Sequence, residues 1–300
     1  MYQLGALPSP HDYRDYPVAK VIPKAVYPAE YIPKPHKVKN QASVGACVAY
    51  ALSVAKEEQE FREKGFYTEY SANFIYGNRA DTDYQGEGMM PREALKRLQS
   101  HGVCKEELMP GIWHYPLQTK LYTPEIYESA EPQKVITYAA INTPDEVKNA
   151  VYVNGPVIIV IPIYSSFYKC TGEVSTPSPS EAIEGYHAMA IIGYTTDRYI
   201  VQNSWGKTWG KDGLCYMPFN YPITEKWAIT DFVPEQDILR LKIDSNVIYK
   251  NGEAVQKDAA PRIINGRTYV PLRHTHELLG DEVQWLADSQ EIIIIRRCCR

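Results

Sequence analysis

The sequence contains no apolar run long enough to span a membrane as a helix, which takes about 20 residues. Its first residues do not combine a basic segment with an apolar one, so they lack the pattern of a secretory signal peptide. We therefore expect a soluble chain without a transmembrane segment. It is either cytoplasmic or secreted with its signal absent from this sequence, and the compartment stays open.

Positive charge is not in excess either, since 32 Lys and Arg stand against 36 Asp and Glu and the net charge is −4. That balance gives no electrostatic footprint for a nucleic-acid partner. The six cysteines are irregularly spaced and include no CxxC pair, so they predict neither a disulfide framework nor a zinc site. We expect no metal and no cofactor. The cysteines are Cys47, Cys104, Cys170, Cys215, Cys298 and Cys299.

Prolines recur through residues 1–36 and forbid a long helix there. Tyrosines lie among them and need a surface to cover, so we expect an extended arm docked on the rest of the chain. The arm is either a structural strap alone or a strap that also restricts an active site. The prolines are Pro8, Pro10, Pro17, Pro23, Pro28, Pro33 and Pro35, and the tyrosines are Tyr13, Tyr16, Tyr27 and Tyr31.

Helix signals come next along the chain and strand signals later. The pattern predicts helices over 45–64, 70–77 and 91–98, the first ended by Gly65 and the third by Gly102. Residues 104–135 are expected to be irregular, and a capping box at Thr143 begins another helix that ends at Gly155. Helices first and strands later favour an α+β fold with a cleft between the halves. The predicted strands cover 157–161, 188–194 and 199–202.

A polar loop that contains Gln41 leads into Cys47, which begins the helix over 45–64. A thiol at a helix N-terminus lies near free N–H groups and the positive end of the helix dipole, which favour the thiolate. Gln41 can bring a side-chain N–H to the same point, as an oxyanion donor requires. For an isolated cysteine, the alternative is a small buried residue without chemistry.

His187 begins one predicted strand and Asn203 ends the next, so a hairpin would bring their side chains together. The imidazole could take the proton of the Cys47 thiol, and the amide could orient the imidazole. A lone histidine is more often structural. The combination with Gln41 and Cys47 favours nucleophilic catalysis.

Three blocks of the sequence, Gln41–Cys47, Gly185–Ala188 and Asn203–Gly210, resemble the papain-like cysteine proteases. The similarity extends from about residue 37 to 233, and Gly102-Val103-Cys104 resembles the bacterial branch. The resemblance implies a two-lobed fold, with a helical lobe and a β-barrel-like lobe. It also implies a cysteine endopeptidase that hydrolyses peptide bonds through an acyl-enzyme.

The same resemblance implies a role for each catalytic residue. Cys47 would be the nucleophile, His187 its base and then acid, and Asn203 the residue that orients the imidazole. Gln41 would donate to the oxyanion together with the backbone N–H of Cys47.

Five further residues are expected to touch the substrate or shield the site. Gly88 and Met89 would form the cleft wall where the substrate backbone pairs. Val160 and Ala188 would line an apolar pocket for the second side chain before the cleaved bond. Trp205 would shield the hydrogen bond between Asn203 and His187.

Four positions depart from the family pattern. Val44 replaces a cysteine that forms a disulfide in many relatives, and Met89 replaces a second glycine on the cleft wall. Ala46 and Val48 replace the usual serine and tryptophan beside the nucleophile. None of these changes removes a group that makes or breaks a bond, so they affect specificity. The lost disulfide favours a bacterial or cytoplasmic relative.

The character of the sequence changes after Pro234, so we predict an arm over 1–36, a peptidase domain over 37–235 and a small α+β domain over 236–300. Residues 238–296 resemble the domain named after the N-terminal part of copper amine oxidases. His274 and His276 lie two residues apart on a predicted helix and point to different faces, so we expect no copper site. An accessory module that binds a cell-surface or protein partner is the favoured interpretation.

Two other functions stay open. A binding module on a catalytically inactive papain fold would retain the cleft without a reactive thiol. A papain-fold cell-wall amidase or acyltransferase would use the same thiol and imidazole on another acyl donor. Peptide and protein substrates are the expected partners of the peptidase itself.

Overall fold

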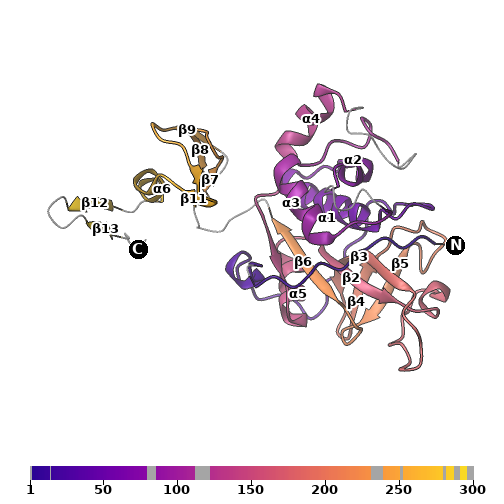
Figure 1. Cartoon of the computed structure of the whole chain (residues 1–300). Coiled ribbons are helices and arrows are strands. Elements are labelled where there is room, and N and C mark those ends of the chain that lie inside the picture. Colours follow the sequence, from indigo (N-terminus) through magenta and orange to yellow (C-terminus); the bar gives the residue numbers. More distant parts are fainter. Residues whose placement is uncertain are drawn as a thin grey trace. The chain divides into compact units, whose positions relative to one another are not determined.

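The computed structural model describes residues 2–13, 15–79, 86–111, 122–230, 239–250, 253–279, 282–286 and 291–295. The chain divides into two compact units, Met1–Phe232 and Val233–Arg300 (Figure 1). Within the described residues, no helix combines the length and the apolar character needed to cross a membrane.

The first unit begins with a helical lobe. Small residues behind Cys47 let α1 pack closely on its neighbours, and Gly65 ends the helix in the left-handed conformation at φ 75°. Proline at the first helical position begins α3, and Gly102 ends it. The helices are α1 (Cys47–Lys64), α2 (Ala72–Gly77), α3 (Pro91–His101) and α4 (Pro124–Ala130), the last followed by the short η4 (Glu131–Gln133).

A six-stranded antiparallel sheet with the order β1-β6-β2-β3-β4-β5 forms the second lobe. Every residue of β2 is buried, which explains its continuous apolar sequence. The capped helix α5 (Pro144–Val153) precedes β2, and the short η5 (Phe167–Lys169) follows it. The strands are β1 (Thr137–Ala140), β2 (Val157–Ile163), β3 (Gly185–Tyr194), β4 (Arg198–Gln202), β5 (Leu214–Pro218) and β6 (Glu225–Thr230).

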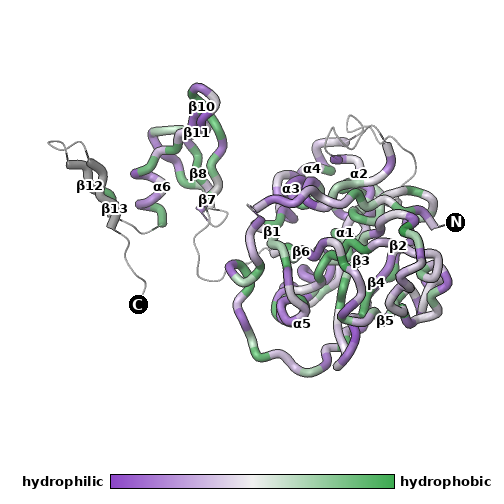
Figure 2. The backbone as a smooth tube through the Cα atoms, turned by 60° about the horizontal axis from the view of Figure 1, so that its bottom comes forward, coloured by the Kyte–Doolittle hydropathy of each residue, from purple (hydrophilic) through white to green (hydrophobic). Residues whose placement is uncertain are grey.

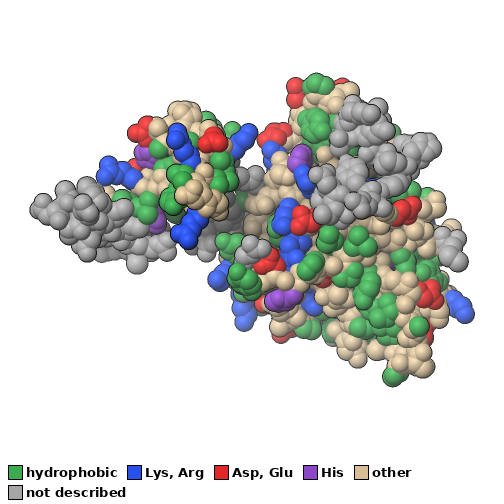
Figure 3. Space-filling model, in the orientation of Figure 1, with side chains coloured by type: hydrophobic (Ala, Val, Ile, Leu, Met, Phe, Trp, Pro, Cys, Tyr) green, Lys and Arg blue, Asp and Glu red, His purple; other side chains and the backbone are tan. Residues whose placement is uncertain are grey.

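The two faces of β2 belong to two different cores. Ile159 and Ile161 face a cluster inside the sheet lobe, which also contains Trp205 and Trp209. Ile158 and Val160 face a cluster that contains the buried side of α1. The tube is accordingly green, the colour of hydrophobic residues, along parts of α1 and of the strands next to it (Figure 2). In the space-filling view, hydrophobic and uncharged side chains cover much of the sheet lobe (Figure 3).

The N-terminal arm is extended and docked, and it has two parts. The first part, which we call the leading segment, comprises residues 2–13 and Asp15. The second part, the strap, comprises residues 17–36 and includes η1 (Val18–Lys20). The strap pairs with β1 through Pro17 and Ala140 and with β3 through Tyr31 and Tyr194. In Figure 1 the indigo arm runs between the helical lobe and the sheet.

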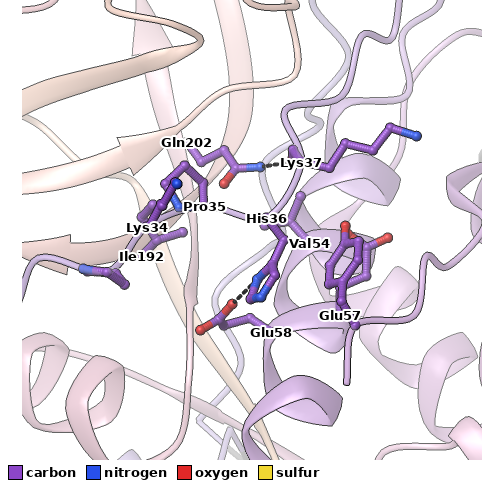
Figure 4. A pocket seen from close by; sticks show the side chains of 11 residues that line it. Lys34, Pro35, His36, Lys37, Val54, Glu57, Glu58, Ile192 and Gln202 are labelled. Atoms are coloured by element: carbon purple, nitrogen blue, oxygen red, sulfur yellow. Dashed lines mark hydrogen bonds and ion pairs between the residues drawn. The ribbon is translucent and has the colours of Figure 1, made fainter. Parts of the chain in front are cut away.

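The end of the strap is held where it meets α1 (Figure 4). The Gln202 side chain donates to the carbonyl of Lys37 at 2.7 Å, and His36 Nδ1 lies 3.2 Å from a Glu58 carboxylate oxygen. The His36 ring stacks on Tyr67 at 4.6 Å. These contacts carry the chain directly into the loop before Cys47.

In its described residues, the second unit consists of short strands and one helix. Asn265 and Gly266, at φ 50° and 73°, form the turn between β10 and β11, as is typical of an Asn-Gly pair. His274 Nε2 lies 3.0 Å from an Asp258 carboxylate oxygen. Residues 296–300, with Cys298 and Cys299, lie outside the described residues. The elements are β7 (Leu239–Leu241), β8 (Val247–Lys250), β9 (Glu253–Gln256), β10 (Arg262–Ile264), β11 (Arg267–Tyr269), α6 (Leu272–Leu278), β12 (Glu282–Leu286) and β13 (Glu291–Ile295).

Candidate active site

Cys47 is the first residue of α1 and is fully buried. Backbone groups of Ala188, Val48 and Gly5 lie near its sulfur and act on its pKa, so the thiol lies beside the residue that follows His187. Burial nevertheless raises the pKa of Cys47 to about 11. The expected thiolate is therefore wrong for this state of the protein, because the loss of water outweighs the N–H groups and the helix dipole.

His187 lies inside β3, and the β3–β4 hairpin brings it to Asn203 as predicted. His187 Nε2 and Asn203 Oδ1 are 2.7 Å apart, and the backbone N–H of Ser204 also donates to Asn203 Oδ1 at 2.7 Å. Because this oxygen only accepts, Nε2 carries the proton and Nδ1 retains its lone pair. Burial lowers the pKa of His187 to about 4, so the imidazole is neutral near pH 7.

Gln41 is fixed by Ser204, which the sequence analysis did not single out. The Ser204 hydroxyl donates to Gln41 Oε1 at 2.6 Å, so the amide nitrogen points the other way. Gln41 Nε2 donates to the carbonyl of Gln3 at 3.1 Å and to the carbonyl of Val44 at 2.9 Å. The residue expected to bind an oxyanion thus already binds a peptide carbonyl of the arm.

Trp205 covers the imidazole, as its ring centroid lies 4.5 Å from that of His187. Its indole also stacks on Tyr2 of the leading segment, with centroids 4.5 Å apart and planes 6° apart. On the sheet lobe, Tyr168 stacks with Trp205 at 5.7 Å. The indole is both a core residue and part of the surface that meets the arm.

The leading segment fills the cleft expected between the lobes. The N–H of Met89 donates to the carbonyl of Gly5 at 2.9 Å, and the N–H of Leu7 donates back to Met89 at 3.0 Å. The N–H of Ala6 donates to the carbonyl of Tyr186 at 3.2 Å. A Cβ on Gly5 would lie 2.0 Å from the carbonyl oxygen of Gly45, so only glycine fits there.

Two charged groups hold the segment further along. The backbone N–H of Ser9 donates to a Glu225 carboxylate oxygen at 2.5 Å. Arg92 binds both carboxylate oxygens of Asp15, at 2.9 and 2.6 Å, and also the carbonyl of Pro10. The Arg92 guanidinium lies 5.5 Å from the Trp227 ring. Side chains thus hold the segment on both sides of its backbone pairing.

The residues expected to contact the substrate differ in how they contact the leading segment. Met89, rather than Gly88, pairs with the backbone of the bound segment. The N–H of Gly88 donates to the Tyr76 hydroxyl, and its carbonyl accepts from Arg79. Val160 and Ala188 belong to the apolar cluster that holds Ala6.

Three residues that hold the leading segment could not be predicted from the sequence, namely Tyr186, Arg92 and Glu225. The backbone carbonyl of Tyr186 leaves no trace in a sequence. Arg92 and Glu225 resemble ordinary surface charges until their partners are known.

Comparisons with known proteins agree with this geometry. The model of the papain family cysteine proteases matches residues 23–229, and that of the copper amine oxidase N-terminal domain matches residues 230–294. The chain belongs to the papain family. An uncharacterized peptidase C1-like protein from Acanthamoeba polyphaga mimivirus is 30% identical over 220 residues, which cover 66% of this chain and 69% of that protein.

Other relatives are more distant. Cathepsin L from Sarcophaga peregrina is 26% identical over 207 residues, which cover 61% of this chain and 55% of that protein. Xylellain, a cysteine protease from Xylella fastidiosa, superposes with a TM-score of 0.63 at 24% identity, over 76% of this chain and 96% of that chain. The fold is therefore papain-like and mixed α+β, and the chain is a papain-family cysteine peptidase.

Proposed function

We propose that the first unit is an endopeptidase that works through Cys47, His187 and Asn203. His187 Nδ1 takes the thiol proton while the sulfur of Cys47 bonds to the carbonyl carbon of a peptide. The imidazolium then gives that proton to the leaving amine. Water hydrolyses the resulting thioester, with His187 again as the base, and the thiol is regenerated.

Asn203 and Gln41 support this reaction from opposite sides. The Asn203 amide oxygen keeps the proton on Nε2, which leaves Nδ1 as the basic nitrogen. Gln41 Nε2 and the backbone N–H of Cys47 would stabilise the negative oxygen of the tetrahedral intermediate. One observation carries the proposal: the Gln3 carbonyl accepts from Gln41 Nε2 in the same peptide segment whose Gly5 backbone contacts the Cys47 sulfur.

Substituting the nucleophile tests the reaction. In a chain whose leading segment has been displaced, Cys47→Ala should abolish both cleavage of fluorogenic peptides and labelling by an epoxide peptide inhibitor. The matched control is Cys104→Ala, which removes another buried thiol from a separate apolar cluster and should leave both intact. Peptidoglycan is assayed alongside. Residual peptide cleavage by Cys47→Ala, or cleavage of peptidoglycan alone, would contradict the proposal.

We also propose that the leading segment holds the enzyme in a resting state. The backbone of Gly5 lies near the Cys47 sulfur, and the N–H of Met89 donates to the carbonyl of Gly5, so the segment occupies the position beside the thiol. The segment therefore covers the thiol. It also excludes the water that would stabilise a thiolate, which is consistent with the raised pKa of Cys47.

A single methyl group tests the resting state. Gly5→Ala would force the leading segment away from Gly45, because the new Cβ meets backbone at 2.0 Å. We expect peptidase activity to rise while the unfolding temperature stays near that of the wild type. Gly86→Ala is the matched control, since a Cβ there meets open space. Unchanged activity in Gly5→Ala would refute the covering role.

The methyl of Ala6 gives the expected chemistry of the neighbouring pocket. It belongs to the same buried apolar cluster as Met89, Val160 and Ala188. We propose that the same pocket accepts an apolar side chain of the substrate. A peptide library cleaved by Gly5→Ala, with Cys47→Ala as the blank, would define this preference.

For residues 236–300 we propose an accessory role. The hairpin of β10 and β11 exposes apolar side chains, which suits contact with a protein or cell-surface partner. These side chains are Ile263, Ile264 and Tyr269, with Val270 directly after them. Deletion of this unit should leave cleavage of short peptides unchanged.

A further inference from the structure

Two cysteines outside the active site lie next to each other on the sheet lobe. Cys215 is the second residue of β5, and its fully buried side chain belongs to the core of that lobe. Cys170 follows η5, is partly buried and packs against the same cluster. Each thiol acts on the pKa of the other, so the two sulfurs are neighbours, although the residues lie 45 positions apart in the sequence.

Backbone pairing fixes this neighbourhood. β5 is the edge strand of the sheet, and residues 172–174 run along its free side. The N–H of Tyr216 donates to the carbonyl of Gly172 at 2.7 Å, and the N–H of Val174 donates to Tyr216 at 2.9 Å. This pairing holds the two segments side by side within two residues of the thiols, and a disulfide requires that its two Cα atoms lie close together.

The two sulfurs have different environments. Hydrogen bonds from the Cys215 thiol and from the Gly172 N–H lower the pKa of Cys170 to about 7. Burial raises the pKa of Cys215 well above its ordinary value. Cys170 is thus the accessible thiol with thiolate character, and Cys215 is the shielded partner behind it.

We propose that Cys170 and Cys215 form a reversible disulfide by exchange with a low-molecular-weight disulfide. The Cys170 thiolate attacks one sulfur of that disulfide, forms a mixed disulfide and releases one small thiolate. Cys215 then loses its proton and attacks the Cys170 sulfur, which releases the second small thiol. Two protein thiols are oxidised and one small disulfide is reduced to two thiols.

Such a bond would fix the wall beside the catalytic imidazole. Phe167 of η5 packs on Trp205 and Trp209, with centroids 5.9 and 5.3 Å away, and Tyr168 stacks with Trp205. Trp205 contacts both His187 and Tyr2. Oxidation would therefore tie the segment that supports Trp205 to the edge strand. The thiol exchange itself does not depend on peptidase activity.

Mass spectrometry of the full chain tests the proposal. The background carries Cys47→Ala, Cys298→Ser and Cys299→Ser, so that neither the nucleophile nor the tail competes for the oxidant. After incubation with oxidised glutathione, we expect a peptide pair linked through Cys170 and Cys215, which dithiothreitol separates. Before oxidation, iodoacetamide at pH 7 should alkylate Cys170 about tenfold faster than the buried Cys104.

Single substitutions assign the two roles. Cys215→Ser should stop the reaction at a stable glutathione adduct on Cys170, whereas Cys170→Ser should prevent both the adduct and the link. Cys104→Ser is the control and should leave the link intact. The proposal is overturned if both thiols of the background protein stay reduced, if Cys170 keeps its glutathione in the presence of Cys215, or if Cys170 links to Cys104 instead.

Discussion

The two parts of the N-terminal arm are held by different forces. The strap places Val18, Val21 and Ile22 in the core of the sheet lobe. The leading segment is held mainly by backbone hydrogen bonds to Met89 and Tyr186, with Ala6 as its buried apolar side chain. Fully burying an apolar side chain contributes about 1.5–3 kcal/mol, whereas a hydrogen bond contributes about 1 kcal/mol net.

Because of this difference, we expect the strap to affect folding and the leading segment to affect access to the active site. The strap is part of the folded body of the first unit, so its loss should expose the core. The leading segment rests on groups that a substrate backbone could equally use, so its loss should expose the active site. Each of the following experiments acts on one part and not on the other.

Deletion should have the largest effect and should differ between the two parts. Removing residues 1–36 would expose core that the strap covers, and we expect an unfolded or aggregated product. Removing residues 1–15 should leave a folded peptidase with at least about hundredfold higher activity, which corresponds to about 2.7 kcal/mol of lost contacts with the leading segment. Circular dichroism and fluorogenic peptide cleavage distinguish the two results. A folded but inactive 1–15 deletion would contradict the covering role.

Acid should loosen the leading segment before it loosens the strap. The pKa of buried His187 is lowered to about 4 from 6.5, so its contribution to the covered state is complete above pH 6.5 and is lost as the pH falls towards 4. The loss amounts to about 3 kcal/mol at most. Hydrogen exchange should therefore quicken in residues 2–13 over this range, and less in the strap.

His187→Gln should remove that response, and His101→Gln, on α3, is the control. An identical pH response in wild type and His187→Gln would assign the loosening to another group.

Breaking the Arg92–Asp15 pair should have a smaller effect. Asp15→Ala removes two charge-assisted hydrogen bonds worth about 2 kcal/mol, or roughly thirtyfold in the ratio of covered to open enzyme. Peptidase activity should rise at constant unfolding temperature. Glu93→Ala is the control, because it removes an exposed pair with Lys96 on the same helix. Equal activities of the two variants would exclude a specific role for the pair.

The smallest effect is expected from Tyr2. Tyr2→Ala removes the ring stacked on Trp205, a contact worth about 1 kcal/mol beyond the buried area, so activity should rise by about fivefold. Tyr13→Ala changes a ring that is 89% exposed and should have no effect. Progress curves at low substrate concentration resolve this difference, and a rise in both variants would contradict a specific contact.

Local sequence signals predicted the elements whose ends are marked by a glycine or a capping residue, and the strand with a continuous apolar sequence. The helices ended by Gly65 and Gly102, the capped helix after Thr143 and the apolar strand β2 agree with the structure. Residues 104–135 were expected to be irregular, but this region contains α4 and η4. The proline at the start of α4 marks a helix N-terminus as well as a break, and the surrounding prolines concealed that signal.

Strands that depend on distant partners could not be predicted in this way. β1 pairs with β6, and β6 pairs with β2, so the order of the sheet follows from contacts between residues far apart in the chain. β5 is held by β4 and by residues 172–174. The prediction of a thiolate at Cys47 was wrong for a related reason. The burial that raises the pKa of Cys47 comes in part from the leading segment, which lies more than 30 residues earlier in the sequence.

The close approach of Gly5 to Gly45 also has a consequence for biosynthesis. The leading segment leaves the ribosome first, whereas Tyr186 and Glu225, which receive it, leave almost 180 residues later or more. During that interval the residues that bind the leading segment have not all been synthesised. The segment therefore cannot direct the folding of the lobes that later enclose it. A nascent chain that assembles both lobes must pass through an uncovered stage before the leading segment reaches its partners.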